Sequence, residues 1–277
     1  MASLRVGFAL SPLALCALAG TSLGQAVVFQ YDGQGTTSSW NEMVNWTNPS
    51  VAQPGGERRP PMDGGNNVIV DFEVVGGQTT SNVNRVTAGA TFYTLNGLSF
   101  DNRGGPNNFA AVTLQGVQLR MVAQANGTVA SIVHNTNGRT HFVNNDIELR
   151  TNLSVSGTAN ASSEIWLNGN ITQAGGAARA LTIGFGNNAG LLLAGNNTYS
   201  GGTTFLGGRM IIGSNTALGA GAGALIVNDT LAVPNIYAAP DSAWTLQNPI
   251  LLQGTAAPVF GATTPPAARC ASTASLT

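Results

Sequence analysis

From residue 66 onward, apolar and polar residues alternate along short runs, and each run ends at a cluster of Gly and Asn. Residues 67–75, NVIVDFEVV, would put four apolar side chains on one face of a strand and Asp71 and Glu73 on the other. This period of two is typical of a strand with one buried face. Further strands are expected at Tyr93–Phe100, Ala111–Val122, Ala130–His134, His141–Leu149, Leu153–Ser156, Glu164–Leu167, Leu181–Phe185, Gly190–Ala194, Thr203–Leu206, Arg209–Ile212, Ala224–Val227 and Ala243–Leu246.

The connections between these runs favour a coil of strands over hairpins. No two-residue Asn-Gly or Asp-Gly turn joins two well-alternating strands, and helical periodicity is nearly absent after the first 26 residues. Gly and Asn adopt the left-handed backbone angles that the corners of a coil require. We therefore expect an all-β chain that forms a right-handed parallel β-helix with a small N-terminal β cap. The alternative is a β-sandwich or jelly roll.

Charge is scarce: charged residues make up 8% of the chain, all eleven basic residues are Arg, and the net charge is −1. Like charges stacked on adjacent strands would repel, whereas Asn, Thr and Ser can form hydrogen-bonded ladders. The composition therefore suits a stack of strands. It also excludes a basic stripe of the kind that binds nucleic acid.

The first 26 residues have the features of a secretory signal peptide. Arg5 precedes an apolar run that extends to Ala19, and small residues follow with possible cleavage after Gly24 or Ala26. The run is shorter than the roughly 20 apolar residues of a membrane-spanning helix. After cleavage only Cys270 would remain, so no intramolecular disulfide is expected.

Residues 27–65 differ from the rest and predict a cap region, with residues 66–253 forming the β-helix. Trp40 and Trp46 lie in this head, followed by a Pro-rich loop. The two indoles could stack on sugar, but covering the apolar end of the solenoid is the favoured interpretation. Residues 254–277 are rich in Ala, Thr and Pro, which predicts a disordered tail.

Three carboxylates are candidates for polysaccharide-cleaving chemistry. Asp146 and Glu148 stand two apart on one expected strand, and Glu164 would lie one turn away. Such a cluster could hold calcium or act as acid and base. Arg150 beside Glu148 favours a solvated charged face instead, and we expect the same for Asp71 and Glu73.

His134 and His141 are the only histidines, and their spacing is not that of a metal pair on one helix or strand. Adjacent corners could bring them together, but they lack further Cys or His partners for zinc. No nucleophile elbow, phosphate-binding loop or dinucleotide fingerprint occurs. The sequence therefore predicts no catalytic, cofactor-binding or metal-binding residues.

Residues 194–222, AGNNTYSGGTTFLGGRMIIGSNTALGAGA, closely resemble the autotransporter-associated β-strand repeat, also called the passenger-associated transport repeat. The matching residues are Asn197-Thr198-Tyr199-Ser200-Gly201-Gly202-Thr203-Thr204 and Leu218-Gly219, within a repeat unit at about residues 191–233. The resemblance implies a bacterial secreted or surface β-helix whose repeat carries no catalytic residues. Residues beyond 252 do not resemble the terminal barrel of an autotransporter.

Together, these features predict a secreted or surface-exposed, non-catalytic β-helical scaffold of the passenger type. Its expected partners are extracellular glycans or cell-envelope components, with no nucleic acid and no membrane-spanning segment after removal of the signal. One alternative is a β-helical polysaccharide lyase or hydrolase that uses the carboxylates. The other is a carbohydrate-binding module that uses Trp40, Trp46 and Trp166.

Overall fold

Strands of three to five residues account for nearly all of the regular structure. The computed structural model describes residues 25–47, 50, 54–74, 79–100, 110–158, 163–186, 189–240, 243–255, 257–262 and 270–272. The signal peptide expected at residues 1–26 lies outside the described residues except for its last two. The helical elements in the described part are two short 3-10 turns, η1 (Met43–Asn45) and η2 (Pro54–Gly56).

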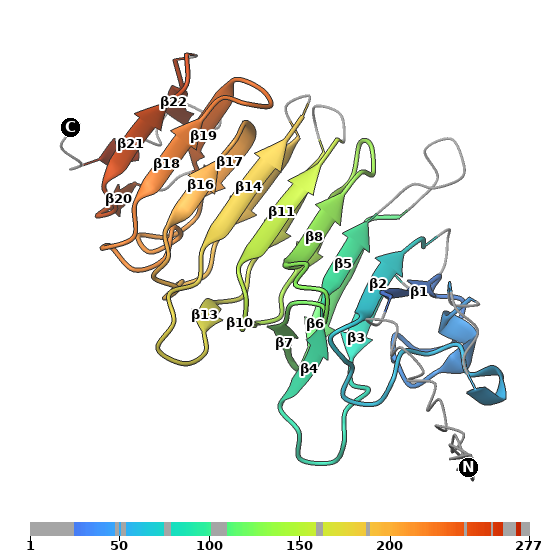
Figure 1. Ribbon diagram of the computed structural model, residues 1–277. Coiled ribbons are helices and arrows are strands. Elements are labelled where there is room, and N and C mark those ends of the chain that lie inside the picture. The colour runs from blue at the N-terminus through green and yellow to red at the C-terminus, as the bar shows by residue number, and fades with distance from the viewer. Residues whose placement is uncertain are drawn as a thin grey trace, which may run out of the picture.

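The strands form four sheets, and neighbouring strands within each sheet run parallel (Figure 1). The nine-stranded sheet contains β1 (Val27–Tyr31), β2 (Val68–Phe72), β5 (Gly97–Phe100), β8 (Ala130–His134), β11 (Leu153–Gly157), β14 (Leu181–Phe185), β16 (Thr203–Phe205), β18 (Leu225–Asn228) and β21 (Ile250–Gln253). The eight-stranded sheet contains β3 (Thr80–Val83), β6 (Thr113–Gly116), β9 (Thr140–Val143), β12 (Glu164–Leu167), β15 (Gly190–Leu193), β17 (Gly208–Ile212), β19 (Pro234–Ala238) and β22 (Val259–Ala262). The third face consists of β4 (Phe92–Leu95), β7 (Gln118–Met121), β10 (Ile147–Leu149) and β13 (Ile171–Gln173), and further along of β20 (Trp244–Leu246) and β23 (Cys270–Ser272).

The chain winds through these faces in a fixed order. From β8 in the nine-stranded sheet it passes to β9 in the eight-stranded sheet and to β10 on the third face, and β11 then returns to lie beside β8. Figure 1 shows the result as a row of strands that progresses from the N-terminal to the C-terminal end. A parallel β-helix is therefore confirmed, and the sandwich or jelly-roll alternative is wrong.

The core runs along the axis of the solenoid as columns of apolar side chains in register. In the nine-stranded sheet one column consists of Ile132, Val155, Ile183, Phe205 and Val227, each at most 2% exposed. Each turn covers the apolar strip of the preceding turn, as in other solenoids, so neighbouring turns stabilise one another. The alternation seen in the sequence thus places apolar residues inside.

Polar side chains link the corners of successive turns. Asp146 Oδ1 accepts the backbone N–H of Asn170 at 2.8 Å, and Asn170 Oδ1 accepts the backbone N–H of Asn196 at 2.8 Å. Nearby, the Asn168 side chain donates to Asn144 Oδ1 at 2.8 Å. These bonds satisfy backbone donors where the chain turns between strands. Asn-rich corners thus contribute to the stacking as well as to the turns.

The strand boundaries differ from the expected ones in three places. The runs 93–100, 111–122 and 141–149 are each divided into two strands by a corner, because a triangular coil bends where the sequence still alternates. Strands β1, β3, β13, β19 and β21 were not predicted. Beyond residue 253, where a disordered tail is expected, β22 pairs with β19 and β23 pairs with β20.

Candidate binding surface

The outer face of the eight-stranded sheet carries a column of apolar side chains, which we call the outer stripe. Its members occupy equivalent register positions on β9, β12, β15, β17 and β19, and they are Phe142, Trp166, Leu192, Ile211 and Tyr237. On β9, β12 and β19 the flanking residues point inward and are buried. The stripe is therefore the outward face of five consecutive turns.

In the central turns the equivalent columns on the other faces are polar, although the column on the nine-stranded sheet continues with Ile226 and Leu251 toward its C-terminal end and with Ile69 toward its N-terminal end. On the nine-stranded sheet, Ser131, Ser154, Thr182 and Thr204 stand in register, and all four are half-buried. On the third face, Arg120, Glu148 and Thr172 stand in register. Since no other outward column of the described strands contains five consecutive apolar residues, the stripe marks one face as a candidate interaction surface.

A charged pair beside the stripe fixes one of its aromatic rings. Arg209 Nη2 lies 2.6 Å from Glu164 Oε1, and the Trp166 indole N–H donates to Glu164 Oε2 at 2.5 Å. Trp166 also packs edge-on against Phe142, with ring centroids 5.2 Å apart. The indole is thus held in place, and the adjacent charges neutralise each other.

Exposure along the stripe is uneven. Leu192 and Ile211 are only 6% and 4% exposed, whereas Phe142, Trp166 and Tyr237 are half-buried. The aromatic residues therefore present most of the accessible apolar surface. The sequence points to Trp166 as a possible sugar-binding residue but not to the stripe, since the register that aligns its members depends on the lengths of the corners.

The proposed carboxylate cluster does not form. Glu148 lies on the third face, where its Oε1 contacts Arg120 Nε at 2.6 Å and Arg150 Nε at 2.7 Å. Although burial opposes ionisation of Glu148, hydrogen bonds from Arg150 and Arg120 lower its pKa. Glu164 lies on the eight-stranded sheet, and Asp146 belongs to the corner ladder. This less favoured alternative fails because strands adjacent in the sequence lie on different faces, whereas the expected pairing of Glu148 with Arg150 is present.

Asp71 also departs from its expected environment. Its side chain is fully buried, whereas Glu73 is half-buried. The expectation of a solvated charged face at both positions was therefore wrong for Asp71. The alternation in this strand correctly placed Val68, Val70 and Phe72 in the core, where each is at most 2% exposed.

The two histidines do meet, but in the apolar core. His134 and His141 are 0% and 1% exposed, and their rings pack edge-on at 5.2 Å. His141 Nδ1 accepts the Val112 backbone N–H at 3.1 Å, while His141 Nε2 and both ring nitrogens of His134 have no hydrogen-bond partner. Burial lowers the pKa of His134 to about 4. Burial, reinforced by His134 and Arg139, lowers the pKa of His141 to about 3.

Trp40 and Trp46 offer no face to a sugar, because they are 0% and 1% exposed. Their rings pack edge-on at 5.4 Å, and Trp40 packs in the same way against Tyr93 at 5.0 Å. The Trp40 indole N–H donates to Ser81 Oγ at 2.7 Å. This arrangement favours the covering role over sugar binding.

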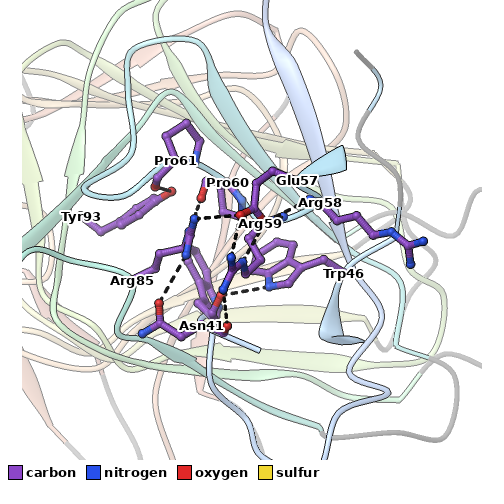
Figure 2. Close-up of polar contacts among 10 residues, drawn as sticks. Asn41, Trp46, Glu57, Arg58, Arg59, Pro60, Pro61, Arg85 and Tyr93 are labelled. Carbon is purple, nitrogen blue, oxygen red and sulfur yellow. Dashed lines mark hydrogen bonds and ion pairs between the residues drawn. The ribbon is translucent and has the colours of Figure 1, made fainter. Parts of the chain in front are cut away.

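A polar network holds the Pro-rich loop in place near Trp46 (Figure 2). Arg59 forms a two-point contact with Glu57, at 2.7 and 2.6 Å, and donates to the Asn41 carbonyl at 2.7 Å. Arg85 donates to the Pro60 carbonyl and lies 3.6 Å from Glu57 Oε2. The hydrogen bond from Arg59 lowers the pKa of Glu57 to about 2. The Arg59–Glu57 contact stiffens the loop, Arg59 joins it to Asn41 of the head, and Arg85 joins it to the solenoid, so the network has a structural explanation.

Comparison with protein-family models, curated proteins and solved structures found no match to this chain. Within the described ranges, no three His, Cys, Asp or Glu side chains gather in a way that could hold a metal ion. The same part of the chain contains no helix long and apolar enough to cross a membrane. The outer stripe is therefore the feature from which a function is best argued.

Proposed function

We propose that this chain is a secreted or cell-surface, non-catalytic β-helical scaffold of the passenger type, and that it adheres to glycan chains through the outer stripe. The observation that carries the proposal is the run of five apolar residues on one outer face, because the equivalent residues of the nine-stranded sheet in the first four of these turns are Ser or Thr. The resemblance of residues 194–222 to the passenger-associated repeat supports the export and scaffold parts.

The stacking of turns gives the scaffold part its physical basis. Each turn that folds onto the preceding one buries an apolar strip and completes a ladder of backbone hydrogen bonds. Such a chain can fold progressively from one end as it emerges from a membrane. The proposal therefore assigns export and folding to the same structural property.

The shape of the stripe favours a narrow, linear partner. Five strands spaced about 4.8 Å apart give a length of about 19 Å, and one column is about 7 Å wide. The resulting area, at most on the order of 130 Å² because Leu192 and Ile211 are only 6% and 4% exposed, is far below the roughly 800 Å² per partner of a stable protein interface. A glycan chain presents apolar sugar faces that can stack on Trp166, Phe142 and Tyr237, and it needs no charge complement. Glu164 and Arg209 beside the stripe could hydrogen-bond to its hydroxyl groups.

Adhesion can be tested by sedimenting the purified chain with insoluble neutral polysaccharides and with isolated cell envelopes. We expect Trp166→Ala to weaken binding about tenfold, because it removes the central aromatic face of the stripe. Met62→Ala is the matched control, since Met62 is 49% exposed and lies in the N-terminal head. Equal binding by both variants, or no binding by the unmodified chain, would refute adhesion through the stripe.

The mixtures of purified chain and polysaccharide also test the proposal that the protein is not catalytic. We expect no release of soluble sugar from these polysaccharides, because Asp146, Glu148 and Glu164 do not converge. Sugar release that disappears in Glu148→Gln would instead establish an enzyme.

Export is tested by expressing the full chain with a C-terminal tag in a bacterial host and sequencing the N-terminus of the mature product. The proposal expects cleavage after Gly24 or Ala26. An uncleaved chain that stays in the cytoplasm would contradict the secretory assignment.

A further inference from the structure

A small cavity lies on the third face, between the loop at residues 213–224 and the end of β20. Its volume is about 160 Å³. Asn215, Thr216 and Gly221 line it from the loop, and Thr245, Gln247 and Asn248 line it from the next turn. The loop belongs to the segment that resembles the passenger-associated repeat, but the cavity also requires the turn that follows.

The walls of the cavity are held by hydrogen bonds between the two turns. Asn248 is 1% exposed, and its side-chain NH₂ group donates to the carbonyls of Gly223 at 2.7 Å and Ala220 at 3.1 Å. The backbone N–H of Thr245 donates to Asn215 Oδ1 at 2.8 Å. The side chains of Asn248 and Asn215 therefore have fixed positions before any ligand arrives, which reduces the entropy lost on binding.

Gly221 keeps the cavity open. A Cβ atom at this position would lie 3.2 Å from Cβ of Gln247, so a larger side chain would occupy the space between the two turns. The backbone φ angle of Gly221 lies outside the left-handed region. A side chain can thus be introduced here to fill the cavity without straining the backbone.

The chemistry of the lining selects the class of ligand. Its side chains are amides and hydroxyls, and none of the lining residues is charged. A charged ligand would lose hydration without gaining a counter-charge, and a purely apolar ligand would desolvate the side-chain amide of Gln247 and the hydroxyl of Thr245 without replacing their hydrogen bonds to water. A neutral ligand that carries several hydroxyl groups satisfies both conditions. The volume is below the roughly 300 Å³ of a typical drug-sized pocket, so it suits a single ring.

We propose that this cavity binds one neutral sugar unit, such as a residue of a larger glycan. The site is separate from the outer stripe, and its existence does not depend on adhesion by the stripe. A shallow site for one ring predicts a dissociation constant on the order of 1 mM.

The experiment is a titration of the full chain with a panel of neutral monosaccharides, which includes hexoses and N-acetylhexosamines, monitored by ligand-observed NMR. We expect at least one sugar to bind, and Gly221→Leu to weaken that binding at least tenfold. Gly176→Leu is the matched control, because an added Cβ at Gly176 meets nothing within 4 Å and its backbone has no positive φ. This control should bind as the unmodified chain does.

A second variant separates loss of the site from loss of the fold. Gln247→Ala removes an exposed amide from the wall without adding bulk, so it should weaken sugar binding while the circular dichroism spectrum stays unchanged. Absence of binding by every sugar would overturn the proposal, as would binding that survives both Gly221→Leu and Gln247→Ala. Binding of a short uncharged peptide in preference to any sugar would also overturn it. Trp166→Ala should leave monosaccharide binding intact, so failure of this site and failure of the outer stripe give different results.

Discussion

The buried histidine pair should make the solenoid sensitive to mild acid. His134 ends β8 and His141 lies in β9, and both rings continue a column of aromatic side chains. Phe72 stacks on Phe100 at 5.0 Å, and Phe100 lies 4.7 Å from His141. Because three of the four ring nitrogens have no hydrogen-bond partner, a proton on either ring would place a charge in an apolar core.

The direction of the pH effect follows from the shifted pKa values. In the unfolded chain both histidines titrate near 6.5, whereas in the folded chain their pKa values fall to about 4 and about 3. Between these limits the unfolded state binds more protons, so stability is full above pH 6.5 and is lost as the pH falls toward 4. For each histidine, the free energy of unfolding falls by about 1.4 kcal/mol for every unit by which the pH decreases in this range. At pH 5 the loss is about 2 kcal/mol for each ring and about 4 kcal/mol for the pair.

The assay is urea unfolding followed by circular dichroism at pH 8 and pH 5. The free energy of unfolding of the unmodified chain should fall by about 4 kcal/mol from pH 8 to pH 5, and that of His134→Phe should fall by about half as much. Phenylalanine continues the aromatic column, and any packing cost it brings cancels in the difference between the two pH values. A pH dependence that is equal in the unmodified chain and in His134→Phe would refute the reasoning.

Three further substitutions test the packing of the solenoid. Trp40→Ala should lower the free energy of unfolding by about 3 to 5 kcal/mol, because it empties a fully buried site; a loss below about 1 kcal/mol in urea titration would contradict this. Gly169→Ala should lower the free energy of unfolding by more than about 2 kcal/mol, since the new Cβ would lie 2.1 Å from the Asn145 carbonyl oxygen. Gly176→Ala, where a new Cβ meets nothing within 4 Å, should change it by less than about 0.5 kcal/mol. Similar thermal midpoints for the two glycine variants would exclude this close approach. Asp146→Ala should cost about 1 kcal/mol by removing the acceptor for the Asn170 N–H, and Asp146→Asn should restore most of it; if Asn is as harmful as Ala, the acceptor role is wrong.

Sequence alone predicted the fold class and many strands, because both follow from local patterns. Alternation placed β8, β12 and β14 at their observed bounds, and β11 within one residue. Strands β3 and β13 were not predicted, since their sequences, TSNV and ITQ, contain few apolar residues. Each forms a strand because a neighbouring turn supplies its hydrogen-bond partners and covers its inward residues.

The candidate sites depended on information that local patterns do not contain. The distance between Glu148 and Glu164 in the sequence gave no indication that a corner separates their faces. The two histidines are in contact because β8 and β9 approach each other in the core. Phe142, Trp166 and Tyr237 align because corners of unequal length preserve the register between turns.

Local alternation and Gly/Asn corners thus determined that this chain coils into stacked strands, since backbone geometry and burial act over a few residues. Which side chains meet was decided only by the tertiary structure, because it depends on the register between turns. A shift of one residue in that register would reverse the inward and outward faces of a strand.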